Sequence, residues 1–204
     1  RFLEHYPISS HTKGAYGEAV AFVREFHLVR QGSSTRGATS GQRREKEKQQ
    51  QRQQQRHSLP VVLDSGCGTG RSSVLLAKSH PDLPVIGVDR SAVRLSKRGG
   101  IAGREGGEGT RRRGEPLPAN LLLLRADLVD LWILASRDDA WEVREHFILY
   151  PNPYPKRSQL RSRWHGHPVF PVLLGLGGRI TLRSNWKSYL DEVCQAVLAI
   201  NDEA

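Results

Sequence analysis

Three glycines at alternate positions follow a short apolar run near residue 65. Residues 61–63 are apolar, Asp64 comes next, and Gly66, Gly68 and Gly70 precede residues that suit a helix. This spacing predicts a buried strand, a tight turn and the start of a helix. Glycine lets the backbone approach a ligand closely, and the first turn of a helix offers unpaired amide hydrogens. We therefore expect a nucleotide-like cofactor to lie against bare amides at this turn.

Two further apolar runs also lead to an acidic residue. Residues 84–88 run into Asp89, and residues 121–125 are followed after one alanine by Asp127. A carboxylate at the end of the second strand can accept hydrogen bonds from both ribose hydroxyls of a nucleotide. The alternative is that Asp64, Asp89 and Asp127 only cap the helices that follow their strands.

A proline-framed segment follows the fourth apolar run of the chain. Residues 146–150 have the composition of a strand, and residues 150–156 read Tyr-Pro-Asn-Pro-Tyr-Pro-Lys. Proline restricts the backbone, so this loop should be rigid. We expect it to present Asn152, Tyr154 and Lys156 at the carboxyl edge of the sheet, where binding residues are commonly found.

A second polar segment follows a fifth predicted strand at residues 179–183. Ser184 and Asn185 come directly after that strand, and Ser184 suits the N-cap of a last helix. We expect this segment and the proline-framed loop to converge at the mouth of the cofactor site. Tyr154 or Trp164 could stack on an extruded base there, although either ring could equally anchor its loop.

Basic residues without acidic ones surround these loops. From His146 to Lys187 the chain contains no Asp or Glu, and the whole sequence of 204 residues has a net charge of +10. Such a charge favours an anionic partner, of which nucleic acid is the commonest. We expect Lys156, Arg161 and Arg163 to contact phosphates. The full basic set of the segment is Lys156, Arg157, Arg161, Arg163, Arg179, Arg183 and Lys187.

These motifs, in this order, resemble those of the tRNA (guanine-N7)-methyltransferase family over about residues 59 to 198. The resemblance implies a Rossmann-like class I methyltransferase that uses S-adenosylmethionine (SAM) and forms 7-methylguanosine in tRNA, at guanine 46 of the variable loop. The cofactor-binding residues that it implies are Asp64, Gly66, Gly68, Gly70, Asp89 and Asp127. The substrate-binding residues that it implies are Tyr154, Lys156, Arg161, Arg163, Ser184 and Asn185.

The sequence departs from the family at two active-site positions. Asn152, the catalytic candidate, and Asn185 stand where the family has aspartates. A divergent enzyme with another target base or another RNA is therefore an alternative, as is a catalytically weak RNA-binding subunit of a larger enzyme. A small-molecule methyltransferase is a third alternative. Asn152 could also serve only to shape its loop.

The composition predicts a single α/β domain with insertions. We expect a helical segment at residues 1–30, a disordered low-complexity insertion at 31–58, and a methyltransferase domain at 59–204 with a flexible insertion at 99–119. The sheet should be mostly parallel with helices on both faces. By the resemblance, the last two strands of the family's sheet should be missing.

The two cysteines, Cys67 and Cys194, are too few and too far apart for a disulfide framework. They indicate a reducing intracellular compartment and no metal site. No apolar run in the sequence is long enough to span a bilayer, so we expect no membrane partner. A tRNA, with or without a protein partner subunit, is the partner we expect.

Overall fold

A computed structural model of the chain describes residues 3, 5–32, 59–97 and 116–202. Nearly all of the low-complexity insertion predicted at 31–58, and most of the insertion predicted at 99–119, lie outside these residues. The predicted division of the chain into segments stays a prediction.

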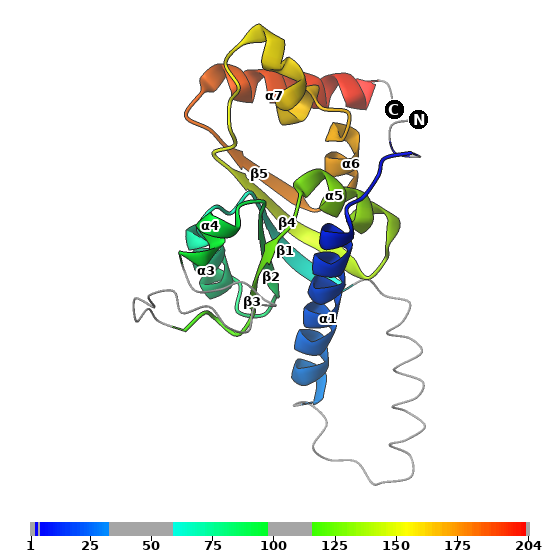
Figure 1. Cartoon of the computed structure of the whole chain (residues 1–204), viewed down its shortest axis with the longest axis vertical. Coiled ribbons are helices and arrows are strands. Elements are labelled where there is room, and N and C mark those ends of the chain that lie inside the picture. The colour runs from blue at the N-terminus through cyan, green and yellow to red at the C-terminus, as the bar shows by residue number, and fades with distance from the viewer. Residues whose placement is uncertain (1–2, 4, 33–58, 98–115, 203–204) are drawn as a thin grey trace.

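The described residues form one sheet of five parallel strands in the order β3-β2-β1-β4-β5 (Figure 1). The strands are β1 (Leu59–Ser65), β2 (Val85–Asp89), β3 (Leu121–Arg125), β4 (Trp141–Leu149) and β5 (Arg179–Arg183). The order reverses between β1 and β4, and in open α/β sheets ligands bind at the carboxyl ends of the strands beside such a reversal.

Helices cover both faces of this sheet (Figure 1). The helices are α1 (Ser10–Gly32), α3 (Arg71–Ser79), α4 (Ala92–Ser96), α5 (Leu128–Arg137), α6 (Phe170–Gly175) and α7 (Lys187–Asp202), with 3-10 helices η1 (Arg157–Ser162) and η2 (Trp164–Gly166) between β4 and α6. Helices α3 and α4 pack on one face in a small hydrophobic cluster. Helices α1, α5, α6 and α7 share a larger cluster on the other face. The predicted α/β class with a parallel sheet is confirmed.

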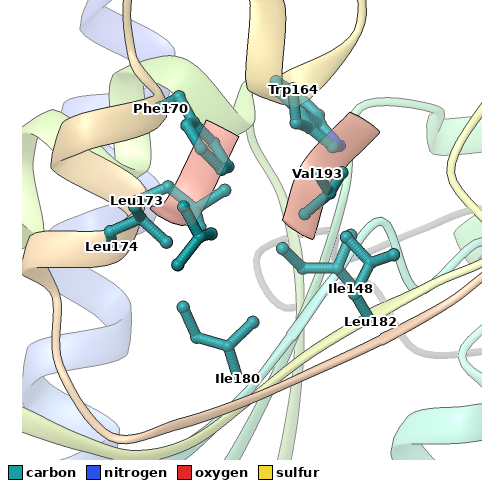
Figure 2. Close-up of a pocket in the computed structure, with 9 residues that line it drawn as sticks. Ile148, Trp164, Phe170, Leu173, Leu174, Ile180, Leu182 and Val193 are labelled. Atoms are coloured by element: carbon teal, nitrogen blue, oxygen red, sulfur yellow. The ribbon is translucent and has the colours of Figure 1, made fainter. Parts of the chain in front are cut away.

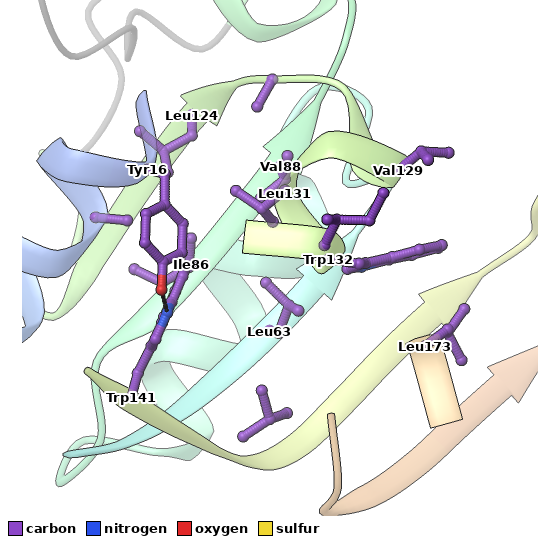
Figure 3. Close-up of a cluster of buried hydrophobic side chains, with 14 of the residues drawn as sticks. Tyr16, Leu63, Ile86, Val88, Leu124, Val129, Leu131, Trp132, Trp141 and Leu173 are labelled. Carbon is purple, nitrogen blue, oxygen red and sulfur yellow. Dashed lines mark hydrogen bonds between the residues drawn. The ribbon is translucent and has the colours of Figure 1, made fainter. Parts of the chain in front are cut away.

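Helix α1 packs on the sheet through an apolar stripe. Ala15, Ala19 and Val23 are buried against the larger cluster. The neighbouring Tyr16 accepts a hydrogen bond from the indole nitrogen of Trp141, and the two ring centroids are 5.1 Å apart (Figure 3). This contact fixes α1 to the beginning of β4.

Strand β4 begins at Trp141, five residues before the strand start expected at His146. A bulge causes the difference: Val61 pairs with Val143, whereas Val62 pairs with Glu145. The extra residue, Arg144, shifts the alternation of side chains, so polar residues stand where a simple strand would carry apolar ones. The charged turn between α5 and β4 is therefore confined to residues 138–140, which is shorter than the sequence suggests.

The apolar run at residues 74–77 predicts that Leu75 lies on the inward side of α3. In the structure Leu75 is exposed, whereas Ser73 and Ala77 are fully buried. The small side chain of Ser73 allows a close approach of α3 to β2 at Gly87. A Cβ atom at Gly87 would lie 2.3 Å from Oγ of Ser73 and 2.7 Å from Cδ2 of Leu123.

We expect Gly87→Ala to lower the free energy of unfolding by about 1–3 kcal/mol, because neither α3 nor β3 can move away without repacking. Gly17→Ala is the matched control, since a Cβ at this helical position meets nothing within 4 Å. The control should raise the free energy of unfolding by roughly 0.5–1 kcal/mol. Urea denaturation measures both, and equal stability of the two variants would contradict the close packing of α3 on β2.

Candidate functional site

The glycine turn between β1 and α3 has the backbone conformation that its composition predicts. Gly66, Gly68 and Gly70 have φ angles of 80°, 60° and 78°, in the left-handed region that side chains with a Cβ rarely adopt. A Cβ at Gly66 or Gly68 would meet nothing within 4 Å, whereas one at Gly70 would lie 2.8 Å from Cδ1 of Leu123. The turn therefore has open space beside its first two glycines and packed core beside the third.

The amides of this turn are already used inside the protein. The amides of Gly66 and Cys67 both donate to the carbonyl oxygen of Val88, at 2.8 and 2.9 Å. The amide of Gly68 donates to Oδ2 of Asp89 at 2.9 Å. The prediction that a ligand lies on bare amides is thus wrong for these three groups, because the turn is tied to the end of β2.

Asp89, the last residue of β2, helps to hold the glycine turn. Its Oδ1 accepts from the amide of Ser91 at 2.7 Å, and its Oδ2 accepts from Gly68 and, at 3.4 Å, from Nη1 of Arg94. A carboxylate offers about four acceptor positions. About one therefore remains for a ligand, which fits one ribose hydroxyl better than the two we expected.

Asp64 is buried beneath the turn, with an exposed fraction of 1%. Its Oδ2 accepts from the hydroxyls of Ser72 and Ser73, each at 2.7 Å, so it holds the first turn of α3. Its Oδ1 has no partner among the described residues. Burial raises the pKa of this carboxyl group, and the two serine hydroxyls act in the opposite direction. A buried acceptor without a partner is rare in native proteins and is an available contact for a donor group.

Asp127 is the N-cap of α5. Its Oδ1 accepts from the amides of Val129 at 2.9 Å and Asp130 at 3.4 Å, and its own amide donates to Oγ1 of Thr12 at 3.3 Å. Asp127 thus caps α5, and its predicted contact with the cofactor stays a prediction. The same contacts attach the start of α1 to the carboxyl end of β3.

The proline-framed loop begins beside the glycine turn, because β1 and β4 pair with Asp64 opposite Phe147. Tyr150 and Tyr154 have φ angles of 53° and 44°, which are strained for residues other than glycine. Oδ1 of Asn152 accepts from the amide of Tyr154 at 3.3 Å, and the rest of this side chain is exposed. Asn152 thus shapes the loop and faces solvent as well.

Arg163 is held by contacts within the protein. Its side chain is only 12% exposed, Nη1 pairs with the carboxylate of Glu192, and Nε donates to the carbonyl oxygen of Tyr154 at 3.1 Å. Arg163 lowers the pKa of Glu192 through these contacts. Arg163 therefore fastens the proline-framed loop to α7, whereas Lys156 and Arg161 are exposed.

Trp164 is a loop anchor. Its ring meets that of Trp132 at a centroid distance of 4.7 Å. It also borders an apolar cavity of about 270 Å³ (Figure 2). The other lining residues are Ile148, Phe170, Leu173, Leu174, Ile180, Leu182, Val193 and Val197. Among the described residues, the large aromatic side chains classed as exposed are Tyr150 and Trp186, which the sequence analysis did not single out.

A buried cluster of three hydrogen-bonded side chains lies next to the glycine turn. The indole nitrogen of Trp132 donates to Oγ of Ser65 at 3.2 Å, and Oγ of Ser65 lies 2.8 Å from Nε2 of His146. His146 is completely buried, and burial lowers its pKa to about 4. Indole can only donate, so the Ser65 hydroxyl is left to donate to a neutral His146. Sequence gives no signal for this contact, since Ser65 and His146 lie on different strands.

The described residues form an α/β domain whose candidate site lies at the junction of β1 and β4. Residues 58–202 match the family model described as "Putative methyltransferase". This match spans well over half of the chain, and the chain belongs to this methyltransferase family.

The curated relatives are tRNA (guanine-N(7)-)-methyltransferases. The protein of Mycolicibacterium gilvum (strain PYR-GCK) is 32% identical over 108 residues, which are 53% of this chain and 38% of that protein. The protein of Acinetobacter baylyi (strain ATCC 33305 / BD413 / ADP1) is 25% identical over 138 residues, 65% of this chain and 49% of that protein. The chain spans about half the length of the curated relatives it matches. The predicted family resemblance is confirmed.

Among solved structures, the antibiotic-resistance methyltransferase Kmr matches with a TM-score of 0.41 and 22% identity, over 72% of this chain and 80% of that chain. Within residues 5–32, 59–97 and 116–202, no helix has the length and apolar character needed to cross a membrane. The same part of the chain holds no group of three or more His, Cys, Asp or Glu residues that could bind a metal ion.

The burial of His146 predicts a dependence of stability on pH. Because the folded-state pKa is about 4 and the ordinary value is 6.5, only the unfolded state takes up the proton between these values. The contribution of His146 to the free energy of unfolding is fully present above about pH 6.5. It falls as the pH drops, by about 1–2 kcal/mol at pH 5. His146→Gln keeps an acceptor for Ser65 and should remove this loss, as measured by urea denaturation at several pH values. The exposed His11→Gln should leave the loss unchanged, and the same slope in all three proteins would contradict the assignment.

Proposed function

We propose that this chain catalyses the SAM-dependent methylation of N7 of a guanine in tRNA. The observation that carries the proposal is the pairing of β1 with β4, which brings the glycine turn and the proline-framed loop to one edge of the sheet. A cofactor on the turn and a base at the loop would then be neighbours. Membership of the methyltransferase family and the names of the curated relatives support the same reaction.

The residues of the glycine turn suit SAM. Open space beside Gly66 and Gly68 leaves room for a ligand against the backbone. Oδ1 of Asp64 is a buried acceptor without a partner in the described chain, and Asp89 keeps about one acceptor position. We infer that these residues hold the polar groups of SAM, which when bound supplies a methyl group activated by a sulfonium centre.

Methylation at N7 makes modest demands on the protein. Guanine N7 already has a lone pair in the plane of the ring, so no general base is needed. The protein has to hold the base in line with the methyl group and to tolerate the positive charge that the base acquires. Asn152 and Asn185, both exposed at the ends of β4 and β5, would orient the base through neutral hydrogen bonds.

The exposed basic residues suit the rest of the RNA. Lys156 and Arg161 lie on the loop and on η1, free of the buried contacts that hold Arg163. We infer that Lys156 and Arg161 contact phosphates and that Arg163 acts indirectly by fixing the loop. Ser184 accepts from the amide of Trp186 at 3.1 Å and thereby shapes the segment that carries Asn185.

The test is incubation of the chain with methyl-labelled SAM and total tRNA, followed by mass analysis of the nucleosides. Labelled 7-methylguanosine is the expected product, and label on another nucleoside would overturn the assignment to N7. Asp89→Ala should weaken SAM binding at least about tenfold by calorimetry, because it removes an acceptor and frees the turn. Asp82→Ala, at an exposed carboxylate paired with Arg30, should bind SAM as the unaltered chain does.

The asparagine at position 152 gives a second test. We expect Asn152→Asp to preserve or raise guanine-N7 activity, because a carboxylate still accepts from the amide of Tyr154 and would also stabilise the cationic product. Charged hydrogen bonds exceed neutral ones by about 1 kcal/mol, so the gain in kcat/KM is at most roughly fivefold. Asn152→Ala is the matched control, because alanine can neither accept from the amide of Tyr154 nor form a hydrogen bond to the base. A large fall in kcat/KM for Asn152→Asp would show that the amide has a role of its own.

A further inference from the structure

Two aromatic rings face solvent at the edge of the sheet where the RNA is proposed to bind. Tyr150 is 60% exposed and Trp186 is 47% exposed, and among the large apolar side chains exposed in the described residues these two alone are aromatic. Tyr150 follows the last residue of β4, and Trp186 follows β5 by three positions. Since β4 and β5 are parallel neighbours with Leu149 opposite Arg183, the two rings belong to adjacent strand ends.

The backbone holds Tyr150 in place at some energetic cost. Its φ angle of 53° lies in the left-handed region, which is rare for a bulky residue. Its amide donates to the carbonyl oxygen of Arg183 at 2.8 Å, which fixes the loop to the end of β5. Pro151 follows and restricts the chain further. Strained residues of this kind cluster at functional sites.

The chain segments that carry the rings are basic. Arg183 is exposed at the end of β5, and Lys156, Arg157 and Arg161 are exposed on the loop and on η1. Exposed aromatic rings flanked by cationic side chains are the pattern of surfaces that bind single-stranded nucleic acid, in which bases stack on rings and phosphates meet the cations. Besides the two rings, Leu160 of η1 is the large apolar side chain exposed among the described residues of these segments, which is little apolar surface for the core of a protein–protein interface.

We propose that Tyr150 and Trp186 stack on an unpaired base of the RNA substrate at the carboxyl ends of β4 and β5. This inference rests on the proposed function, since it takes RNA as the substrate. It assigns to these two rings the stacking role that the sequence suggested for Tyr154 or Trp164. Trp164 borders the apolar cavity (Figure 2) and its ring packs on Trp132, so stacking on a base would break these contacts.

Tryptophan fluorescence offers a direct test. The chain has four tryptophans; Trp132 and Trp141 are buried, and Trp164 packs on Trp132. Quenching of the emission by a single-stranded RNA oligonucleotide should therefore report on Trp186. We expect quenching in the unaltered chain and in Tyr150→Phe, and little or none in Trp186→Phe or Trp186→Leu. Persistent quenching in Trp186→Leu would overturn the proposal.

The binding constants give an independent readout. Trp186→Leu should raise Kd for the RNA about 5- to 100-fold, the range expected for loss of one stacked base. Tyr150→Asn should also raise Kd, and asparagine tolerates a positive φ, so the loop is kept. Neither variant changes a charge, so the slope of log Kd against log salt should stay constant, whereas Lys156→Ala should reduce it. Leu198→Ala, at an exposed apolar residue of α7, should leave Kd unchanged.

The outcomes separate this inference from the proposed function. Normal formation of 7-methylguanosine by Trp186→Leu and Tyr150→Asn at limiting tRNA, with unchanged Kd, would overturn stacking and leave the function standing. Quenching that depends on Trp186, without any methylation of tRNA, would support stacking and count against the function. RNA binding without any change in tryptophan emission would overturn stacking.

Discussion

The parallel pairing of β1 with β4 is the contact on which the rest of the structure depends. It joins two segments far apart in the sequence, with Asp64 opposite Phe147. The central residues of β1, Val61, Val62 and Leu63, are almost completely buried, so a change of register would move an apolar strand against polar surroundings. The bulge between the two strands keeps Trp141 and Val143 on the same face as Ile148. The glycine turn and the proline-framed loop both owe their positions to this pairing.

The acidic residues at the strand ends use most of their hydrogen bonds within the protein. Asp89 binds the amide of Gly68, Asp64 binds the two serine hydroxyls of α3, and Asp127 caps α5. Each carboxylate fixes the end of a strand relative to the next helix or turn. A site built in this way is held in one conformation before the ligand arrives, so less binding energy is lost to ordering. The cost is that fewer acceptor positions remain for the ligand itself.

Local patterns in the sequence predict the strands, the glycine conformations and the order of elements, because these depend on side-chain periodicity and on the allowed backbone angles. The start of β4 escapes prediction because a bulge breaks the periodicity. The contact of Arg163 with Glu192 cannot be predicted from local patterns, because the two residues meet only once α7 has folded back against the preceding segment. Which tryptophan is buried and which is exposed depends on the packing of α5 against η2, so Trp164 and Trp186 cannot be told apart by their neighbours in sequence.

The distribution of charge bears on the rate of the proposed reaction. Methyl transfer moves one positive charge from the cofactor to the base, so what matters is the difference in potential between the two positions. Asp64 and Asp89 lie on the side of the glycine turn, and Asn152 and Asn185 put no carboxylate on the side of the base. The protein alone therefore favours the charge on the cofactor side. The phosphates of a bound RNA would offset this preference, because they bring negative charge to the side of the base. Lys156 and Arg161 would hold the phosphates there. On this argument the RNA supplies part of the electrostatic stabilisation that an aspartate at position 152 would otherwise give.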